Sequence, residues 1–232
     1  MSGALTGRTA VITGASRGIG AAIARRFADA GATLALWGRD AHELAAVAAD
    51  ARARGARVVT ALADLTDPAA LTAAVATTRA EVGPIDLLVN NAGIVLRKPT
   101  ATITDGEWRQ MMAINLDAPF QLIRAFADDL VTRRGRVINV ASIAGRQGTA
   151  LLAAYCTAKH GLVGLTRALA EEWRGQVPVN AICPGSVDTD MLRQGMLGAA
   201  PAMSPDDVAT AALFLAADAP TAMTGACLDL FG

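Results

Sequence analysis

The feature of this sequence that most limits its possible folds is an alternation of short apolar runs with longer, Ala-rich amphipathic stretches. Continuous apolar runs are typical of strands in a parallel sheet covered on both faces, joined by right-handed crossovers. We therefore expect an α/β fold: a single doubly wound, Rossmann-like domain over residues 1–232, with a parallel sheet of about seven strands. The expected strands are 9–13, 34–37, 58–62, 87–90, 136–141, 177–182 and 226–230.

Charge and composition exclude several classes of protein. Lys+Arg and Asp+Glu balance at 21 each, so no basic field favours nucleic acid or an anionic membrane. We find no apolar run long enough to span a bilayer and no signal peptide, which predicts a soluble, cytoplasmic protein. The three cysteines lack the spacing of a metal site or a disulfide framework, and no metal is expected.

A glycine-rich turn, Thr13-Gly-Ala-Ser-Arg-Gly-Ile-Gly20, follows the first expected strand and opens a helix expected at 21–30. Gly14 permits a tight turn, Gly18 lets the backbone approach a pyrophosphate, and Gly20 allows close packing of helix on strand. The helix N-terminus would supply N–H donors to phosphate. The spacing is GxxxGxG instead of GxGxxG, but its place between strand and helix still predicts a nucleotide site.

The chain contains two lysines, Lys98 and Lys159, and a single tyrosine, Tyr155. Tyr155 and Lys159 are four residues apart, which places them on one face of a helix. A nearby ammonium group favours the phenolate and is expected to lower the pKa of the tyrosine from its reference value of about 10. The pair is therefore a candidate general acid/base.

A proline lies four residues after Asn115. Pro119 has no N–H to donate to the Asn115 carbonyl, so that oxygen is expected to stay free. We predict a helix kink between the two residues that exposes this acceptor. The alternative is that Pro119 only marks a helix end.

These motifs occur together in one register. The glycine-rich turn, Asn90-Asn91-Ala92-Gly93, Ser142, Tyr155-x-x-x-Lys159 and Pro184-Gly185 resemble the short-chain dehydrogenase/reductase family over nearly the whole chain. The resemblance implies that Ser142 hydrogen-bonds the substrate oxygen and that Lys159 also binds the nicotinamide ribose. It also implies that Asn115 is the fourth catalytic residue, whose main-chain carbonyl holds a water leading to Lys159. It implies a cofactor site formed by Gly14, Ser16, Arg17, Gly18, Ile19, Gly20, Arg39, Asp64, Leu65, Asn91, Ala92, Gly93, Tyr155, Lys159, Pro184, Gly185, Val187 and Thr189.

The residues that discriminate between NAD and NADP are expected at the end of the second strand. An acidic residue there would bind both ribose hydroxyls of NAD, but this chain has Gly38 followed by Arg39. Arg39 and Arg17 could pair with a 2′-phosphate, because arginine makes strong bidentate contacts with phosphate. NADP(H) is therefore the predicted cofactor. Arg39 as a solvated turn charge is the alternative.

The resemblance implies an NADPH-dependent carbonyl reductase, reversible as a secondary alcohol dehydrogenase. The segments LVNNAG, GRVINVAS and VNAICPGSVDTDM look closest to 3-oxoacyl carrier-protein reductases. The stretch 94–99, with Arg97 and Lys98, is instead similar to sugar-acid dehydrogenases such as gluconate 5-dehydrogenase. A non-catalytic NADP(H)-binding sensor is the alternative from another class.

Glycines and prolines interrupt residues 184–205, which we expect to be irregular, with a short substrate loop around 186–204. Apolar residues of this loop, with two leucines before Tyr155, predict an adaptable apolar pocket for a small carbonyl or alcohol substrate. They are Leu151, Leu152, Met191, Leu192, Met196, Leu197 and Met203.

Self-association is also expected. The helices predicted around 107–130 and 153–173 contain more apolar residues than packing on one face of the sheet would bury. The zero net charge of the chain does not oppose association. We expect a homotetramer, as in most of the family.

Overall fold

The computed structural model describes residues 3–195 and 200–232. All strands run parallel in one seven-stranded sheet of order β3-β2-β1-β4-β5-β6-β7, which confirms the predicted α/β fold. The order reverses between β1 and β4, and the switch point of such a sheet is where ligands bind. The strands are β1 Thr9–Thr13, β2 Thr33–Gly38, β3 Val58–Leu62, β4 Leu87–Asn90, β5 Arg136–Val140, β6 Val179–Pro184 and β7 Cys227–Leu230.

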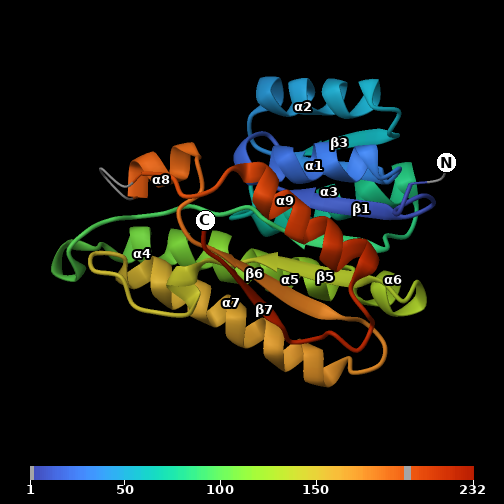
Figure 1. Ribbon diagram of the computed structural model, residues 1–232. Helices are drawn as coiled ribbons and strands as arrows, with labels where there is room; N and C mark the ends of the chain where they lie inside the picture. Colours follow the sequence, from blue (N-terminus) through green and yellow to red (C-terminus); the bar gives the residue numbers. More distant parts are fainter. Residues whose placement is uncertain (1–2, 196–199) are drawn as a thin grey trace.

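Helices cover both faces of this sheet (Figure 1). On one face α1 (Gly18–Asp29), α2 (Ala41–Ala53) and α9 (Pro205–Leu213) pack on inward residues such as Ile12. The other face carries α3 (Pro68–Val82), α5 (Ala118–Ala125), α6 (Ala127–Thr132) and α7 (Ala153–Glu172), packed on residues such as Val11. Successive strand residues thus alternate between two cores, which explains the continuous apolar runs. The remaining α-helices described are α4 (Asp105–Met112) and α8 (Asp190–Gly195).

Three local predictions differ from the structure. β6 begins at Val179 instead of residue 177, because the Val177 N–H donates to the Trp173 carbonyl and Pro178 has no N–H. The first helix begins at Gly18 instead of residue 21. Residues 184–205 are not wholly irregular, since they contain α8, whose first turn is closed by the Leu192 N–H donating to Thr189 Oγ1 at 3.3 Å.

The predicted kink near Asn115 takes the form of a wider turn. Residues 113–117 form a π-helical segment between α4 and α5, in which the Ala118 N–H donates to the Ala113 carbonyl. Pro119 lies in the first turn of α5, where a missing N–H costs little. A π-helical segment therefore takes the place of the predicted kink, and Pro119 does not lie inside a continuous α-helix.

Candidate active site

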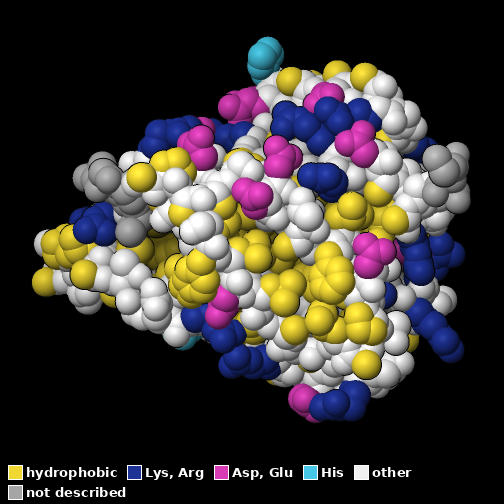
Figure 2. All heavy atoms as spheres, in the orientation of Figure 1, with side chains coloured by type: hydrophobic (Ala, Val, Ile, Leu, Met, Phe, Trp, Pro, Cys, Tyr) yellow, Lys and Arg dark blue, Asp and Glu magenta, His cyan; other side chains and the backbone are white. Residues whose placement is uncertain are grey.

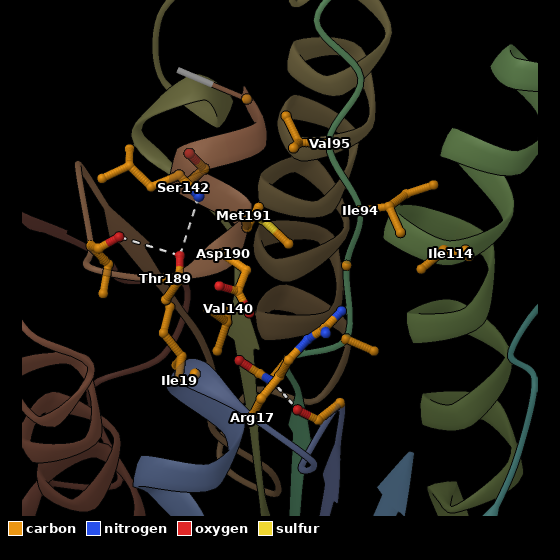
Figure 3. A pocket seen from close by; sticks show the side chains of 18 of the residues that line it. Arg17, Ile19, Ile94, Val95, Ile114, Val140, Ser142, Thr189, Asp190 and Met191 are labelled. Carbon is orange, nitrogen blue, oxygen red and sulfur yellow. Dashed lines mark hydrogen bonds between the residues drawn. The ribbon is translucent and has the colours of Figure 1, made fainter. Parts of the chain in front are cut away.

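A cavity of about 800 Å³ lies at the carboxyl ends of the strands. Every predicted cofactor residue lines it except Gly20, and so do Ser142, Tyr155 and Lys159 among the predicted catalytic residues. Figure 3 shows its two sides, with Ile94, Val95 and Ile114 facing Ser142, Thr189 and Met191, and Arg17 at one end. The cavity thus brings together residues from eight segments of the chain that are far apart in sequence.

The glycine-rich turn is packed too tightly for side chains. Gly14 has φ +63°, and a Cβ on it would lie 2.8 Å from the Ala92 Cα. A Cβ on Gly20 would lie 2.1 Å from the Gly14 carbonyl oxygen, so Gly20 serves close packing below the pocket, as its place in the motif predicts. The resulting bare backbone before α1 fits a pyrophosphate.

Asn91 holds this turn against the end of β4. Its Nδ2 donates to the carbonyls of Thr13 at 2.9 Å and Gly14 at 3.1 Å. The Thr13 hydroxyl in return accepts from the backbone N–H groups of Asn91 and Ala92 at 3.0 and 3.1 Å. These bonds join the two loops at the switch point into one floor beneath the cavity.

Charged side chains line the end of the cavity next to β2. Arg17 lies 3.9 Å from Glu43, and Arg39 faces Asp64. Hydrogen bonds from Thr66, and to a smaller degree the charge of Arg39, hold the pKa of Asp64 below its usual range. Glu43 was not among the predicted residues. The signal that could have found it is its place in the first turn of α2, immediately after the predicted cofactor segment.

Tyr155 is 8% exposed, and Ser142 lies near its hydroxyl. The predicted lowering of its pKa is not seen: burial raises the pKa of Tyr155 to about 12, with the nearby Ser142 hydroxyl opposing this shift. The Lys159 Nζ lies 5.8 Å from the centre of the tyrosine ring, too far to offset burial. In this structure Tyr155 is therefore a protonated phenol, suited to donate a proton.

Lys159 is 3% exposed, and its Nζ donates to the Val140 carbonyl at 2.8 Å. Burial lowers the pKa of Lys159 to about 8. A Cβ on Gly93 would lie 3.6 Å from this Nζ, so the glycine of the Asn-Asn-Ala-Gly segment leaves room beside it. The ammonium group thus lies between the ends of β4 and β5 and the helix that carries Tyr155.

Asn115 is buried and does not line the cavity. Its side chain makes a reciprocal pair with the backbone of Ile94: Nδ2 donates to the Ile94 carbonyl at 3.1 Å, and Oδ1 accepts from the Ile94 N–H at 3.2 Å. Nδ2 also donates to the Met111 carbonyl at 3.0 Å. The side chain of Asn115 thereby fixes one wall of the pocket to the π-helical turn.

The half of the cavity beyond Tyr155 is mostly apolar. Leu152, Met191 and Leu192 line it as predicted, but Leu151 and Met203 do not, and Met196 and Leu197 lie outside the described residues. Met203 is buried because its segment forms a bridge with Val187. Figure 2 shows hydrophobic side chains lining the recess below α8. Sequence reasoning missed Ile94, Val95 and Ile114 as wall residues, although each adjoins a motif.

The two cations expected at the pocket mouth have other partners. Lys98 Nζ lies 2.9 Å from both carboxylate oxygens of Glu107, and Arg97 donates to the Ala150 carbonyl at 3.5 Å. Neither residue lines the cavity.

Within residues 3–195 and 200–232, no cluster of three or more His, Cys, Asp or Glu side chains could hold a metal ion. No helix in these ranges is long and apolar enough to cross a membrane.

Comparison with known proteins agrees with this geometry. The model of the family described as short chain dehydrogenase matches residues 8–197. The chain is 35% identical to a 3-oxoacyl-[acyl-carrier-protein] reductase of Chlamydia trachomatis, covering 100% of this chain and 99% of the relative. It is 40% identical to a galactitol 2-dehydrogenase (L-tagatose-forming) of Cereibacter sphaeroides, covering 98% and 95%.

A solved structure of a gluconate 5-dehydrogenase from Burkholderia cenocepacia, in complex with NADP and tartrate, superposes with a TM-score of 0.90. It is 32% identical to this chain, with 98% of this chain and 95% of that chain covered. Family, fold and full-length similarity point to the same class of enzyme, whose members use NAD(P) and act on CH–OH groups. The chain belongs to the short-chain dehydrogenase/reductase family of oxidoreductases.

Proposed function

We propose that this protein is an NADPH-dependent carbonyl reductase, reversible as a secondary alcohol dehydrogenase, acting on apolar ketones or 3-oxoacyl groups. The observation that carries the proposal is that Ser142 and Tyr155 line the cavity together, near one another, between the dinucleotide cradle and an apolar pocket. A nicotinamide cofactor bound in this cradle supplies the hydride. A non-catalytic sensor would not need Ser142, Tyr155 and Lys159 together in one cavity.

Each catalytic side chain has a distinct task in this proposal. Ser142 orients the substrate oxygen and Tyr155 donates its proton to it, as its raised pKa permits. Lys159 binds the nicotinamide ribose and restores the proton of Tyr155, and we propose that a water on the Asn115 carbonyl links Lys159 to solvent. Residues 1–232 act as one dinucleotide-binding and catalytic domain, since the site draws on strands across the whole sheet.

NADP(H) is the proposed cofactor because Arg17 and Arg39 line the β2 end of the cavity, next to Gly38. The test is the Gly38→Asp/Arg39→Leu variant, which we expect to shift preference toward NADH. A Cβ on Gly38 would lie 3.3 Å from the end of the Leu44 side chain, so an aspartate fits after a small movement. Equal affinity of the unmodified protein for NADPH and NADH would refute this assignment.

A sugar-acid or polyol dehydrogenase is the second candidate, favoured by the full-length similarity to galactitol 2-dehydrogenase. Many substrate hydroxyls would need hydrogen-bond partners, which Ile94, Val95, Ile114 and Leu152 cannot supply. The deciding experiment compares an apolar ketone, a 3-oxoacyl ester and 5-ketogluconate with NADPH. Faster turnover of the keto acid, lost on Arg97→Ala, would overturn the choice.

We further propose a homotetramer in the cytoplasm. Trp108 on α4 and Phe120 on α5 are 41% and 45% exposed, which supports association through these helices. Figure 2 also shows hydrophobic side chains gathered over α9 and β7. The cysteines Cys156, Cys183 and Cys227 are all free, in keeping with a reducing compartment.

A further inference from the structure

Below the candidate active site, toward the amino ends of the strands, a chain of buried side-chain hydrogen bonds joins two strands to the helix that carries Tyr155. Asn90 on β4 donates from Nδ2 to Asn139 Oδ1 on β5 at 2.9 Å, and Asn139 Nδ2 donates to Thr166 Oγ1 on α7 at 2.9 Å. The Thr166 hydroxyl in turn donates to the Leu162 carbonyl at 2.8 Å. Asn90 is 2% exposed, and Asn139 and Thr166 are 0% exposed. The proposed reaction uses none of these side chains.

The direction of this chain of hydrogen bonds is fixed. The one hydrogen of the Thr166 hydroxyl goes to the Leu162 carbonyl, so its oxygen can only accept from Asn139. Asn139 must therefore present its amide nitrogen to α7 and its oxygen to β4. Asn90 must then donate to Asn139, and its own Oδ1 is left buried without a hydrogen-bond partner within the described part of the chain. Because an unpaired buried acceptor lowers stability, this arrangement indicates a use other than stability.

The two strands that carry the asparagines also lead into the site. Asn139 lies three residues before Ser142. Asn90 lies three residues before Gly93, where a Cβ would lie 3.6 Å from Lys159 Nζ. Asn90 and Asn139 are direct neighbours in the register of β4 and β5. The hydrogen-bond chain therefore begins on the strands whose carboxyl ends bring Ser142 and Gly93 to the cavity.

On α7, Thr166 lies about two helical turns after Lys159 and therefore on the same face of the helix. Within the described part of the chain, the side-chain hydrogen bonds between α7 and the sheet are of two kinds. One is the bond from Asn139 to Thr166, and the other runs from Lys159 to the Val140 carbonyl. In the proposed reaction Lys159 acts on the ribose and on Tyr155, so its hydrogen bonds are expected to change during turnover. The bond to Thr166 is then the permanent one.

Close packing at the site end of α7 limits its distance from β5 but not its place along the sheet. A Cβ on Gly145, three residues after Ser142, would lie 2.7 Å from the Lys159 carbonyl oxygen, so the two backbones are in contact. Dispersion contacts between bare backbones have little directional preference. A hydrogen bond is directional, and the bond from Asn139 to Thr166 can therefore fix the helix along its axis.

We propose that Asn139 and Thr166 are positioning residues, whose hydrogen bond sets where α7 lies along the sheet. It thereby sets how close Tyr155 lies to Ser142. This inference rests on the proposed carbonyl reduction, in which these two hydroxyls act on one substrate oxygen.

The test is Thr166→Val, which keeps the shape of the side chain and removes its oxygen. With ethyl 3-oxobutanoate and saturating NADPH, we expect kcat to fall by at least about tenfold, because a small misplacement of a catalytic group lowers the rate strongly. The KM for the ester should stay within about twofold, since binding groups are untouched. Thr166→Ser keeps the hydroxyl and should restore kcat to within about threefold of the unmodified protein.

Thr78→Val is the matched control. Thr78 is 1% exposed and accepts from Trp37 Nε1 at 3.0 Å, but it lies on α3. Its loss should lower the midpoint of thermal unfolding to a similar degree as Thr166→Val and leave kcat within about twofold, because it removes a buried hydrogen bond without moving α7.

A second readout does not need turnover. The chain has one tyrosine, so protein labelled with ¹³C at tyrosine Cζ gives one NMR signal, that of Tyr155. We expect this signal to shift in Thr166→Val, to return in Thr166→Ser and to stay in place in Thr78→Val. If the unmodified protein does not reduce the ester, the proposed function fails, and the Tyr155 signal alone decides the inference.

An unchanged Tyr155 signal in Thr166→Val would overturn the inference, and so would an unchanged kcat in an active protein, because Thr166 would then only stabilise the fold. Failure of Thr166→Ser to restore the altered readouts would also reject it, since the hydroxyl would not be their cause. An equal fall of kcat in Thr78→Val would show that lost core stability explains both variants, and would contradict a positioning role.

Discussion

At the scale of single residues, the site depends on two ionisable side chains kept away from water. Burial raises the pKa of Tyr155 to about 12 and lowers the pKa of Lys159 to about 8, so both neutral forms are favoured. The hydrogen bond that Lys159 donates to the Val140 carbonyl makes the burial of its amino group tolerable. Such paired, oppositely shifted groups are characteristic of proton-transfer sites.

Replacing Tyr155 by Phe removes the proton donor and preserves the buried ring. We expect turnover to fall by about 10²- to 10⁴-fold, the usual contribution of a general acid, while NADPH affinity stays within about twofold. Steady-state kinetics and NADPH fluorescence titration measure the two quantities. Lys159→Ala serves as the contrast, because loss of the ribose contact should weaken both. Substantial activity in Tyr155→Phe would reject the proposed role.

The burial of Lys159 also makes stability depend on pH. Its pKa is about 8 in the folded state against about 10.4 in the unfolded chain, so between these values the unfolded chain binds more protons. Stability contributed by this site therefore rises with pH across this window, by about 1 kcal/mol per pH unit, and is constant below it.

Urea unfolding of the unmodified protein and of Lys159→Met from pH 7 to 9.5 checks this. The free energy of unfolding of the unmodified protein should gain on that of the variant above pH 8. Parallel curves over the whole range would show that Lys159 keeps its ordinary pKa.

At the scale of elements, the segment between β4 and α4 is a pocket wall fixed at several points. Asn115 binds the backbone of Ile94, and the Lys98 N–H donates to the Leu151 carbonyl at 2.8 Å. Glu107 joins the capping box of α4 with Thr104 and also accepts from the Lys98 ammonium group. Hydrogen bonds from Thr104 and Lys98 lower the pKa of Glu107 to about 2, so the carboxylate is ionised at neutral pH.

Glu107→Ala should therefore loosen this wall. We expect a lower free energy of unfolding, because Thr104 loses the reciprocal bond of the capping box, and a rise in KM for the ketone larger than the fall in kcat. Lys98→Met removes the ion pair but keeps the cap, and should change stability by less. Thermal unfolding and ketone kinetics measure both effects; a change confined to kcat would contradict a role in positioning the wall.

At the scale of the whole molecule, the amino ends of the strands carry a structural cluster opposite the site. Asp86 is 1% exposed and accepts from the Thr9 N–H at 2.9 Å, from Arg8 at 3.1 Å and from Arg133 at 3.1 Å. The cluster joins β1 to the segments before β4 and β5. The amino ends of the strands thus carry a cluster that stabilises the fold, and the carboxyl ends carry the candidate active site.

Asp86→Asn should lower the free energy of unfolding by about 3 kcal/mol, because two arginines and a buried N–H lose an ionised acceptor. We expect kcat/KM at 20 °C to stay within about twofold of the unmodified protein's value, since Asp86 lies at the amino ends of the strands and the cavity at their carboxyl ends. Denaturant unfolding and ketone kinetics separate the two. Loss of activity in a variant of unchanged stability would show that the amino and carboxyl ends of the strands are energetically coupled.

The proposed homotetramer can be tested by its mass and by a substitution on its expected interface. Light scattering at micromolar concentration should give the mass of four 23.7 kDa chains. Phe120→Glu, on the exposed face of α5, should lower that mass by placing a charge in the interface. The mass of one chain for the unmodified protein would contradict the tetramer.

The sequence by itself determined the fold and most of the residues that line the cavity. The spacing of apolar residues in strands and helices is a local property of the sequence. The predicted strands 9–13 and 58–62, for example, match β1 and β3. Glycines near the first helix and the Tyr155-x-x-x-Lys159 spacing are likewise constraints within a few residues. This is why nearly all predicted cofactor residues line one cavity.

Only the tertiary structure decided properties that depend on burial and on contacts between distant segments. The pKa of Tyr155 rises instead of falling, because desolvation by the surrounding elements outweighs a lysine 5.8 Å away. Lys98 pairs with Glu107, and the side chain of Asn115 holds Ile94, since the π-helical turn brings these segments together. A smaller cavity lined by Ile143, Gly185 and Phe231 likewise exists only because the segments after β5 and β6 meet the C-terminal residues, and no local sequence period encodes such a contact.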